Sequence, residues 1–323
     1  MKLTKKSKIV VIGGAGLIGS HTVDLLSNYE FKELIIFDNL TRGNTTNLKN
    51  AFKDKRIKIY EFGGNILDYD ILNSCLKNTD YVFHFAALWL LHCHEFPLSA
   101  FEVNVKGTFN VMQACIENKV KKLIYSSSAS VYGDALYEPI DEKHPFNNKN
   151  FYGATKIASE AMLRSYHYRY KLNFIGLRYM NVYGTRQDYK GAYIAVIMKM
   201  LDKIDENANI EIFGNGKESF DFVNVKDCAL ANYKSLISNK NNNFYNVGTG
   251  KKTSLNQIAK LLLKLTKSKS KIVYKKNSSA TLVKNRIGSP LLAEREIKFK
   301  AKISLEEGLQ ELIKWRTAHK KFS

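Results

Sequence analysis

A glycine-rich turn near the N-terminus constrains the fold of this chain more than any other feature. The apolar, β-branched run Lys8 to Ile12 is typical of a strand buried in a parallel sheet, and residues 17–27 show helical spacing. Between them, Gly13 allows a tight turn, Gly16 lets the backbone approach a pyrophosphate closely, and Gly19 lets the helix pack against the sheet. The start of such a helix offers free N–H groups to phosphates. A strand, glycine turn and helix in this order predict a dinucleotide-binding unit.

The first half of the chain alternates strand and helix patterns. Further strands are predicted over 33–37, 57–61, 81–85, 122–125 and 174–178, and helices over 68–77, 100–118 and 151–171. This rhythm indicates an α/β fold with a Rossmann-type, doubly wound parallel sheet. We expect residues 1–180 to form an NAD-binding domain that carries the catalytic residues.

Beyond residue 186 the alternation loosens. Helices are predicted over 192–204, 254–266 and 304–316, and strands over 209–213, 220–225 and 243–247. We expect residues 181–323 to form mainly a smaller α/β substrate lobe. Part of it, about 220–250, is expected to return to the first domain.

An acidic residue at the end of the second strand indicates which dinucleotide binds. Asp38 lies about twenty residues beyond the glycines, where a carboxylate bonds the ribose hydroxyls and repels a 2′-phosphate. This favours NAD over NADP, although Arg42 lies close by in the sequence.

The composition limits the classes of partner. Hydrophobic residues make up 45 % and charged residues 25 % of the 323, as in a globular protein, and no apolar run is long enough to span a membrane. The net charge of +20 raises nucleic acid as a partner, but the lysines are spread along the chain. We therefore expect no nucleic acid and no membrane partner, and a surface that attracts small anionic substrates.

Cysteine usage and the N-terminus favour a cytoplasmic protein without a metal. The four cysteines contain no CxxC pair, and the N-terminus passes straight into a strand without a signal-peptide pattern. The run His92-Cys93-His94-Glu95 has metal-ligand residue types, but neighbouring side chains point in different directions and no second cluster completes a site. No metal is predicted.

A serine, a tyrosine and a lysine form the candidate catalytic group. Ser128 ends the fifth strand, and the carboxyl ends of parallel strands are where open α/β sheets bind ligands. Tyr152 and Lys156 are four residues apart, so they share one face of a helix. Such a pair also occurs on ordinary polar helix surfaces. Its position after the glycine turn, Asp38 and Ser128 favours a proton-transfer site, in which the ammonium and a positive nicotinamide ring depress the phenol pKa.

Over essentially its full length the chain resembles the extended short-chain dehydrogenase/reductases, specifically the sugar-nucleotide epimerase/dehydratase group. The matching stretches are GGAGLIGSHTVDLL, FDNLTRGN, HFAAL, NVKGTFNVMQAC, SSSASVYG, YGATK, LRYMNVYG, FDFVNVKD and FYNVGTG.

The resemblance implies a set of binding residues. The adenosine and pyrophosphate of NAD would contact Gly13, Gly16, Leu17, Ile18, Gly19, Asp38 and Asn39. Adenine would contact Asn65 and Ile66, although the family usually has Asp where Asn65 stands. The nicotinamide half would be lined by Phe85, Ala86, Ala87, Asn104, Tyr152, Lys156 and Tyr179, and the substrate diphosphate would meet Asn181.

The residues after the serines distinguish branches of this group. The 4,6-dehydratases resemble one another in an Asp-Glu pair before VYG, where this chain has Ala129 and Ser130. SSSASVYG resembles the 4-epimerases, in which the tyrosine takes the 4-hydroxyl proton, hydride moves to NAD, and the 4-keto sugar takes the hydride back on its other face. NAD would then be a tightly held prosthetic group.

Two alternative functions remain open, and so does the oligomeric state. One is a reductase or 3,5-type epimerase of a 4-keto sugar; the other is a non-catalytic NAD-binding scaffold. The resemblance also implies a homodimer through the helices at 100–118 and 151–171, and a role in surface polysaccharide or glycoconjugate synthesis.

Departures from the family pattern leave the substrate open between a UDP-hexose and a UDP-hexuronic acid. Phe220 replaces a usual Arg, Ser279 stands where a basic residue usually meets the diphosphate, and Trp89 stands where UDP-galactose epimerases commonly have Lys. Arg186 or Arg286 is therefore expected to bind the diphosphate or a carboxylate on the sugar.

Overall fold

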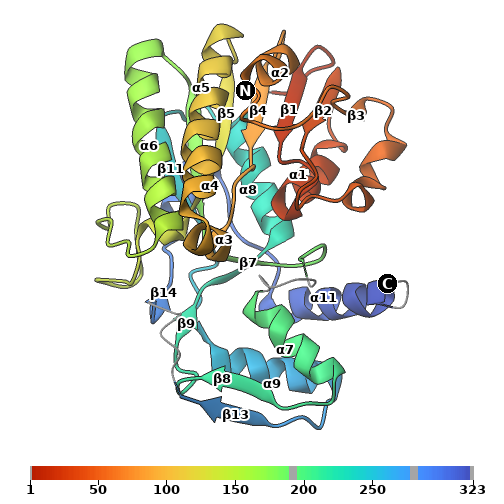
Figure 1. Cartoon of the computed structure of the whole chain (residues 1–323), viewed down its shortest axis with the longest axis vertical. Coiled ribbons are helices and arrows are strands. Elements are labelled where there is room, and N and C mark those ends of the chain that lie inside the picture. The colour runs from red at the N-terminus through yellow and green to blue at the C-terminus, as the bar shows by residue number, and fades with distance from the viewer. Residues whose placement is uncertain (1, 189–194, 277–282, 321–323) are drawn as a thin grey trace.

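A seven-stranded parallel sheet forms the centre of the larger part of the molecule (Figure 1). The structure is a computed structural model that describes residues 2–188, 195–276 and 283–320. The strand order is β11-β6-β5-β4-β1-β2-β3, and every pairing is parallel. The strands are β1 (Lys8–Ile12), β2 (Glu33–Phe37), β3 (Ile57–Ile59), β4 (Tyr81–His84), β5 (Lys122–Ser128), β6 (Phe174–Tyr179) and β11 (Asn243–Val247). The predicted Rossmann-type doubly wound sheet is confirmed.

Alternate residues of the central strands bury opposite faces of the sheet. In β1, Ile9 and Val11 belong to one apolar cluster, while Val10 and Ile12 belong to the other. This period of two is what a strand covered on both faces requires. The first cluster includes side chains of α1 (Leu17–Leu26), α8 (Val225–Ile237) and α10 (Leu291–Ile297), and the second those of α2 (Tyr69–Cys75), α5 (Gly107–Glu117) and α6 (Phe151–Tyr170).

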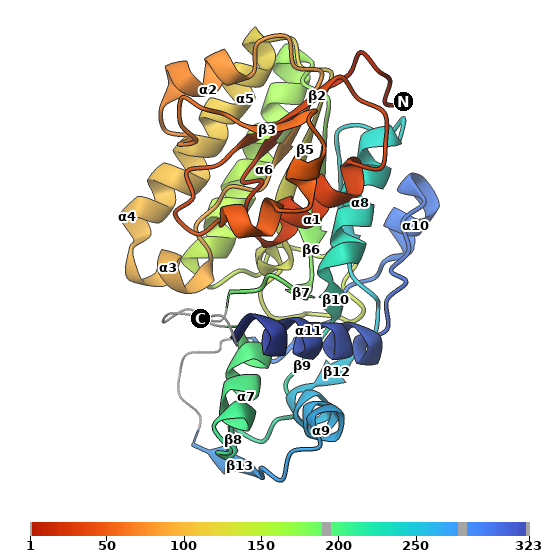
Figure 2. The ribbon, with the colours of Figure 1, turned by 90° about the vertical axis from the view of Figure 1, so that its right-hand side faces the viewer.

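The smaller lobe has its own apolar core, formed by α7 (Val196–Asp205), α9 (Leu255–Thr266), α11 (Leu305–Lys320) and β8 (Ile210–Phe213). In Figure 2, α11 lies between the large sheet and the rest of this lobe. The lobe's short strands are β7 (Asn181–Tyr183), β9 (Ser219–Phe220), β10 (Phe222–Asn224), β12 (Thr253–Ser254), β13 (Ile272–Lys275) and β14 (Asn285–Arg286). Part of the predicted helix 192–204 lies outside the described residues, as does Ser279.

The chain crosses back to the large sheet twice after residue 181. The stretch 220–250 supplies α8, which packs against α1, and β11, which pairs with β6 at the sheet edge. Later, Ala293, Ile297 and Phe299 join the same apolar cluster as β1. Helix α8 was missing from the sequence prediction, because its buried face includes polar and small residues such as Asp227, Ala231 and Asn232 rather than a run of large apolar ones.

Several short elements connect the strands to the helices. They are η1 (Thr45–Leu48), η2 (Ala51–Lys53), α3 (Leu90–Glu95), α4 (Pro97–Ala100), a π-helical turn η3 (Phe101–Lys106) that leads directly into α5, and η4 (Ala129–Val131) after β5. The predicted helix 100–118 is therefore π-helical at its start.

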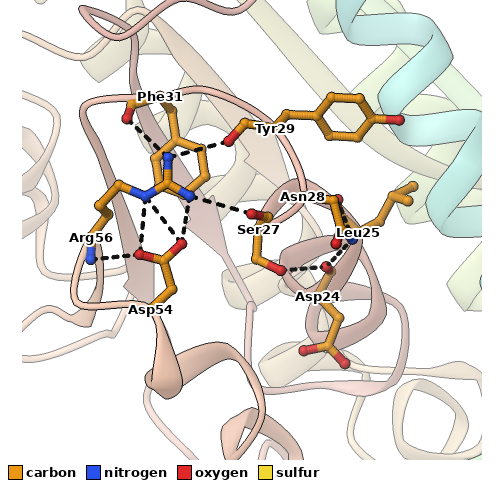
Figure 3. A network of polar contacts seen from close by, with 8 residues as sticks. All are labelled: Asp24, Leu25, Ser27, Asn28, Tyr29, Phe31, Asp54 and Arg56. Carbon is orange, nitrogen blue, oxygen red and sulfur yellow. Dashed lines mark hydrogen bonds and ion pairs between the residues drawn. The ribbon is translucent and has the colours of Figure 1, made fainter.

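An arginine fixes the connection from α1 to β2, as Figure 3 shows. The Arg56 guanidinium donates hydrogen bonds to the backbone carbonyls of Ser27, Tyr29 and Phe31, and it pairs with Asp54 at 2.6 Å. These carbonyls follow the end of α1, where backbone acceptors lack helical partners. Arg56 thus holds the far end of the helix whose N-terminus faces the candidate site.

Candidate active site

A cavity of about 510 Å³ lies over the carboxyl ends of the central strands. The strand order reverses between β1 and β4, and in open α/β sheets ligands bind at this switch point. The cavity wall combines residues of the glycine turn, the ends of β4, β5 and β6, and the loop after β7. Among those predicted to bind, it includes Gly13, Gly16, Leu17, Ile18, Gly19, Phe85, Ala87, Trp89, Ser128, Tyr152, Tyr179, Asn181 and Arg186.

The glycine turn has no room for side chains at two positions. Gly13 has a φ of 77°, and a Cβ there would lie 2.6 Å from the Ala86 nitrogen. A Cβ on Gly19 would lie 2.2 Å from the Gly13 carbonyl oxygen. The first turn of α1 has no side-chain cap and no acidic residue, so its N–H groups face the cavity unneutralised. The turn therefore fits the pyrophosphate of a dinucleotide.

The residues expected at the adenosine end lie together. A Cβ on Gly64 would lie 2.1 Å from the Asp38 backbone carbon, so the segment that carries Asn65 crosses directly over Asp38 and Asn39. The Asp38 carboxylate accepts the N–H groups of Ala15 and Leu40, both at 2.8 Å. Burial raises its pKa, and these two hydrogen bonds oppose the rise. Ile66 is buried, and its carbonyl accepts a bond from Asn110.

Tyr152 and Lys156 share one face of α6, beside Ser128 at the end of β5. The Lys156 ammonium lies 5.7 Å from the centroid of the Tyr152 ring and donates to the Ser126 carbonyl at 2.7 Å. The Ser128 oxygen accepts the Ser130 N–H at 3.1 Å, which leaves the serine's hydroxyl proton available for another acceptor. These three groups can hold and move a proton.

The acidity of these groups differs from the sequence expectation. Burial raises the pKa of Tyr152 to about 12, although a hydrogen bond with Ser128 acts in the opposite direction. Burial also lowers the pKa of Lys156 to about 8. The chain alone therefore does not lower the phenol pKa as expected. A positive nicotinamide ring beside the phenol would act in the required direction.

The nicotinamide-side residues have two kinds of role. Phe85, Ala87 and Tyr179 line the cavity, and Tyr179 donates its hydroxyl proton to Asn232 at 2.6 Å. Asn104, by contrast, is buried. Its amide exchanges hydrogen bonds with both the N–H and the carbonyl of Leu88, so it braces the loop after β4. That Asn104 lines the nicotinamide half stays a prediction.

Three loops meet beside the cavity in an arrangement that the sequence did not reveal. The Arg42 guanidinium lies 5.0 Å from the centroid of the Trp89 ring and 3.4 Å from the Asp188 carboxylate. The three residues follow β2, β4 and β7, so no local pattern links them. Arg42 is thus directed at Trp89 and Asp188.

The two candidate arginines have different surroundings. Arg186 pairs with Asp24 of α1, so its charge already has a carboxylate partner within the chain. Arg286 donates from Nε to the Gly133 carbonyl at 3.3 Å, in the loop that follows Ser128. Asn181, also predicted to meet the substrate, lies on the cavity wall.

A buried ion pair joins β6 to α6, and the same carboxylate binds the end of β5. Glu160 accepts two bonds from Arg178, at 2.9 and 2.6 Å, and one from the Ser127 hydroxyl at 2.6 Å. Arg178 also donates to the Tyr132 hydroxyl at 2.7 Å. Glu160 stands four residues after Lys156, a spacing from which its shared helix face could have been recognised.

Two buried histidines make the fold sensitive to acid. Burial lowers the pKa of His21 to about 4 and that of His84 to about 3. The unfolded chain, with histidine pKa values near 6.5, binds these protons first as the pH falls, so folding stability is lost from about pH 6.5 downwards. At pH 5 we expect each histidine to cost about 2 kcal/mol of unfolding free energy relative to neutral pH.

Urea unfolding at pH 7 and pH 5 tests this expectation. His21→Gln should lose about 2 kcal/mol less than the unsubstituted chain between these pH values. His319→Gln is the control, because His319 is exposed on α11. An equal loss in both variants would show that His21 does not titrate as stated.

Among residues 2–188, 195–276 and 283–320, no three His, Cys, Asp or Glu side chains gather as a metal site would require. Within the same ranges, none of the helices has the length and apolar character needed to cross a membrane.

Comparison with known proteins identifies the family. Residues 9–248 match the NAD dependent epimerase/dehydratase family. A provisionally assigned UDP-glucose 4-epimerase of Methanocaldococcus jannaschii is 35% identical over 312 residues, which cover 95% of this chain and 97% of that protein. The dTDP-D-glucose 4,6-dehydratase of Homo sapiens is 31% identical over 320 residues, which cover 95% of this chain and 89% of that protein.

A solved structure is similar over almost the whole length. The UDP-N-acetylglucosamine 4-epimerase from Methanobrevibacter ruminantium M1, in complex with UDP-N-acetylmuramic acid, has a TM-score of 0.91 and 34% identity, covering 99% of this chain and 100% of that one. With its glycine turn, its Ser/Tyr/Lys group and this match, the chain belongs to the NAD-dependent epimerase/dehydratase family, and its cofactor is NAD.

Proposed function

We propose that this protein is a sugar-nucleotide 4-epimerase, acting on a UDP-hexose or a UDP-hexuronic acid. The observation that carries the proposal is the Ser128, Tyr152 and Lys156 group at the carboxyl end of β5, next to a glycine turn shaped for NAD. Relatives of both the epimerase and the dehydratase type match the chain, so the choice between them rests on the residues around this group.

The side chains suit transient oxidation at C4. NAD, which the glycine turn would hold, would supply a hydride acceptor for C4 and would return the hydride to the opposite face of the sugar ring. Tyr152 takes the 4-hydroxyl proton during oxidation and gives it back during reduction, and Ser128 donates a hydrogen bond to the same oxygen. Lys156, held by the Ser126 carbonyl, keeps a positive charge near the phenol and favours its ionised form.

The residues beyond Ser128 argue against dehydration. Loss of the 6-hydroxyl as water needs an acid close to C6. The positions after Ser128 carry Ala129 and Ser130, both buried in η4, and neither has an ionisable side chain. A 4-keto sugar formed here would keep its 6-hydroxyl and take the hydride back, which favours epimerisation.

Product analysis tests the proposed reaction. The purified protein is incubated with UDP-, GDP- and CDP-sugars, and the products are examined by mass spectrometry and NMR. Unchanged mass with inverted C4 is expected. Loss of water would identify a dehydratase, stoichiometric consumption of NADH a reductase, and the absence of reaction with retained NAD a non-catalytic scaffold.

Exposed large apolar side chains support a homodimer. The surface of α4, η3, α5 and α6 exposes large apolar residues that a monomer would leave in water, including Leu98, Phe101, Phe109, Phe151 and Tyr170. In Figure 1, α4, α5 and α6 lie on the same side of the sheet. Two copies pairing through these helices would cover the patch. We further infer that the enzyme is cytoplasmic and that it acts in the synthesis of a surface polysaccharide or glycoconjugate. The identity of its preferred sugar tests the second of these inferences.

A further inference from the structure

Two loops meet above the glycine turn of the NAD site. In the large sheet, β1 lies between β2 and β4. Arg42 belongs to the loop after β2 and Trp89 to the loop after β4, and the Arg42 guanidinium carbon lies 5.0 Å from the centroid of the Trp89 ring. Because the glycine turn follows β1, this contact spans the place where the turn begins. Both side chains line the cavity together with Gly13 and Gly16.

The loop that carries Arg42 is fixed to the glycine turn. The carbonyl of Ala15, within the turn, accepts the Asn44 N–H at 3.2 Å and the Asn47 side-chain amide at 2.9 Å. A Cβ on Gly43, the neighbour of Arg42, would lie 2.8 Å from Cβ of Ala15. These contacts hold Arg42 at the rim of the site that fits the pyrophosphate.

Arg42 is the cation best placed to meet the phosphate charge. Among the described residues that line the cavity, Arg42 and Arg186 are the only lysines or arginines. Arg186 pairs with Asp24 of α1, so its charge is already compensated within the chain. The pair of Arg42 with Asp188 is weaker, because its N–O distance is 3.4 Å and the two side chains are 39% and 48% exposed. A phosphate can therefore compete for the Arg42 charge.

The shape of a guanidinium suits both contacts at once. Its five N–H donors lie in one plane, and the one hydrogen bond from Arg42 to a described residue runs from Nη2 to Asp188. The remaining donors can bind phosphate oxygens through paired hydrogen bonds. The flat face of the group, which takes no part in those bonds, lies over the Trp89 ring. Arg42 can thus bind a phosphate while it keeps its contact with Trp89.

We propose that Arg42 binds the pyrophosphate of NAD on the glycine turn, and that its contact with Trp89 closes the site, so that NAD leaves only when this bridge opens. Asp188, in the loop after β7, ties the bridge to the segment that leads to the smaller lobe. The inference goes beyond the proposed function, because it concerns the retention of NAD and holds for any reaction at the sugar.

The dissociation rate of NAD tests the proposal without any sugar nucleotide. The holoenzyme is loaded with radiolabelled NAD, excess unlabelled NAD is added, and the label retained on the protein is followed over time. Arg42→Met removes the charge at similar length, Arg42→Lys keeps the charge without the planar face, and Trp89→Leu removes the ring. Arg295→Met is the matched control, because 73% of that side chain is exposed on α10. The melting temperature of each variant confirms folding.

We expect Arg42→Met to raise the dissociation rate of NAD by about 10- to 100-fold, the effect of losing charge-assisted hydrogen bonds. Trp89→Leu should raise it by about 5-fold, the effect of losing a cation–π contact, and Arg42→Lys by an intermediate factor. The double variant Arg42→Met with Trp89→Leu should release NAD no faster than Arg42→Met alone, because both changes open one bridge. Arg295→Met should leave the rate unchanged.

Competition with labelled NAD at equilibrium shows which part of the cofactor Arg42 contacts. Arg42→Met should weaken ADP-ribose, which carries the pyrophosphate, and change the affinity of adenosine less than about 3-fold. An equal loss for adenosine, an unchanged dissociation rate in Arg42→Met, or single effects that multiply in the double variant would each overturn the inference. If the rates change as expected but no sugar nucleotide is epimerised, only the proposed function fails.

Discussion

Replacing Tyr152 by Phe is expected to lower kcat for C4 epimerisation by about 10²- to 10⁴-fold, the range that a positioned general acid–base contributes. The ring that forms part of the cavity wall remains, so retained NAD and the melting temperature should stay close to those of the unsubstituted protein. The reaction is followed by NMR of the nucleotide sugar, and NAD by its release on denaturation.

Tyr168→Phe serves as the matched control, because Tyr168 lies on the same helix with 68% of its surface exposed. It should retain full activity. If Tyr152→Phe also kept full activity with NAD bound, the proton-transfer role of Tyr152 would be rejected, and with it the mechanism above.

Replacing Glu160 by Gln is expected to destabilise the fold by about 3–5 kcal/mol, because it leaves the Arg178 charge buried without its carboxylate. Both side chains are 3% exposed, so water cannot replace the lost partner. Ser127, which donates to the same carboxylate, precedes Ser128 of the candidate catalytic group. Urea unfolding of the NAD-bound protein measures the effect.

The double variant Glu160→Gln with Arg178→Met should recover much of this loss, since it removes the unpaired charge as well. Glu102→Gln breaks an exposed pair with Lys106 and should cost less than about 0.5 kcal/mol. If Glu160→Gln cost no more than Glu102→Gln, the buried pair would not be the support that we infer.

Features that depend on neighbouring residues were predictable from the sequence. The bounds of β1 and β2 agree with their apolar runs, and a side chain at Gly19 is excluded by contacts with Gly13 and Gly14 in the same strand–turn–helix unit. The four-residue spacing of Tyr152 and Lys156 places both on one face of any helix. In each case, backbone geometry over a few residues sets the outcome.

Features that depend on distant contacts and burial were not predictable. Burial in the folded chain raises the pKa of Tyr152, whereas a depression is expected from the Lys156 ammonium together with a positive nicotinamide ring. Asn104 is expected to line the nicotinamide half, but its hydrogen bonds to the N–H and the carbonyl of Leu88, sixteen residues away, follow from the fold alone. Arg42 contacts Trp89 and Asp188 only because three separate loops end at the same edge of the sheet.

The sequence by itself determined the NAD-binding fold and the Ser128, Tyr152 and Lys156 group, because turns, strands and helix faces follow from local spacing. Only the tertiary structure decided what surrounds each of the two candidate arginines. Arg186 meets Asp24 of α1, whereas Arg286 is buried beside Gly133 without a paired carboxylate among the described residues. That difference arises from contacts more than a hundred residues apart in the chain, which no local pattern encodes.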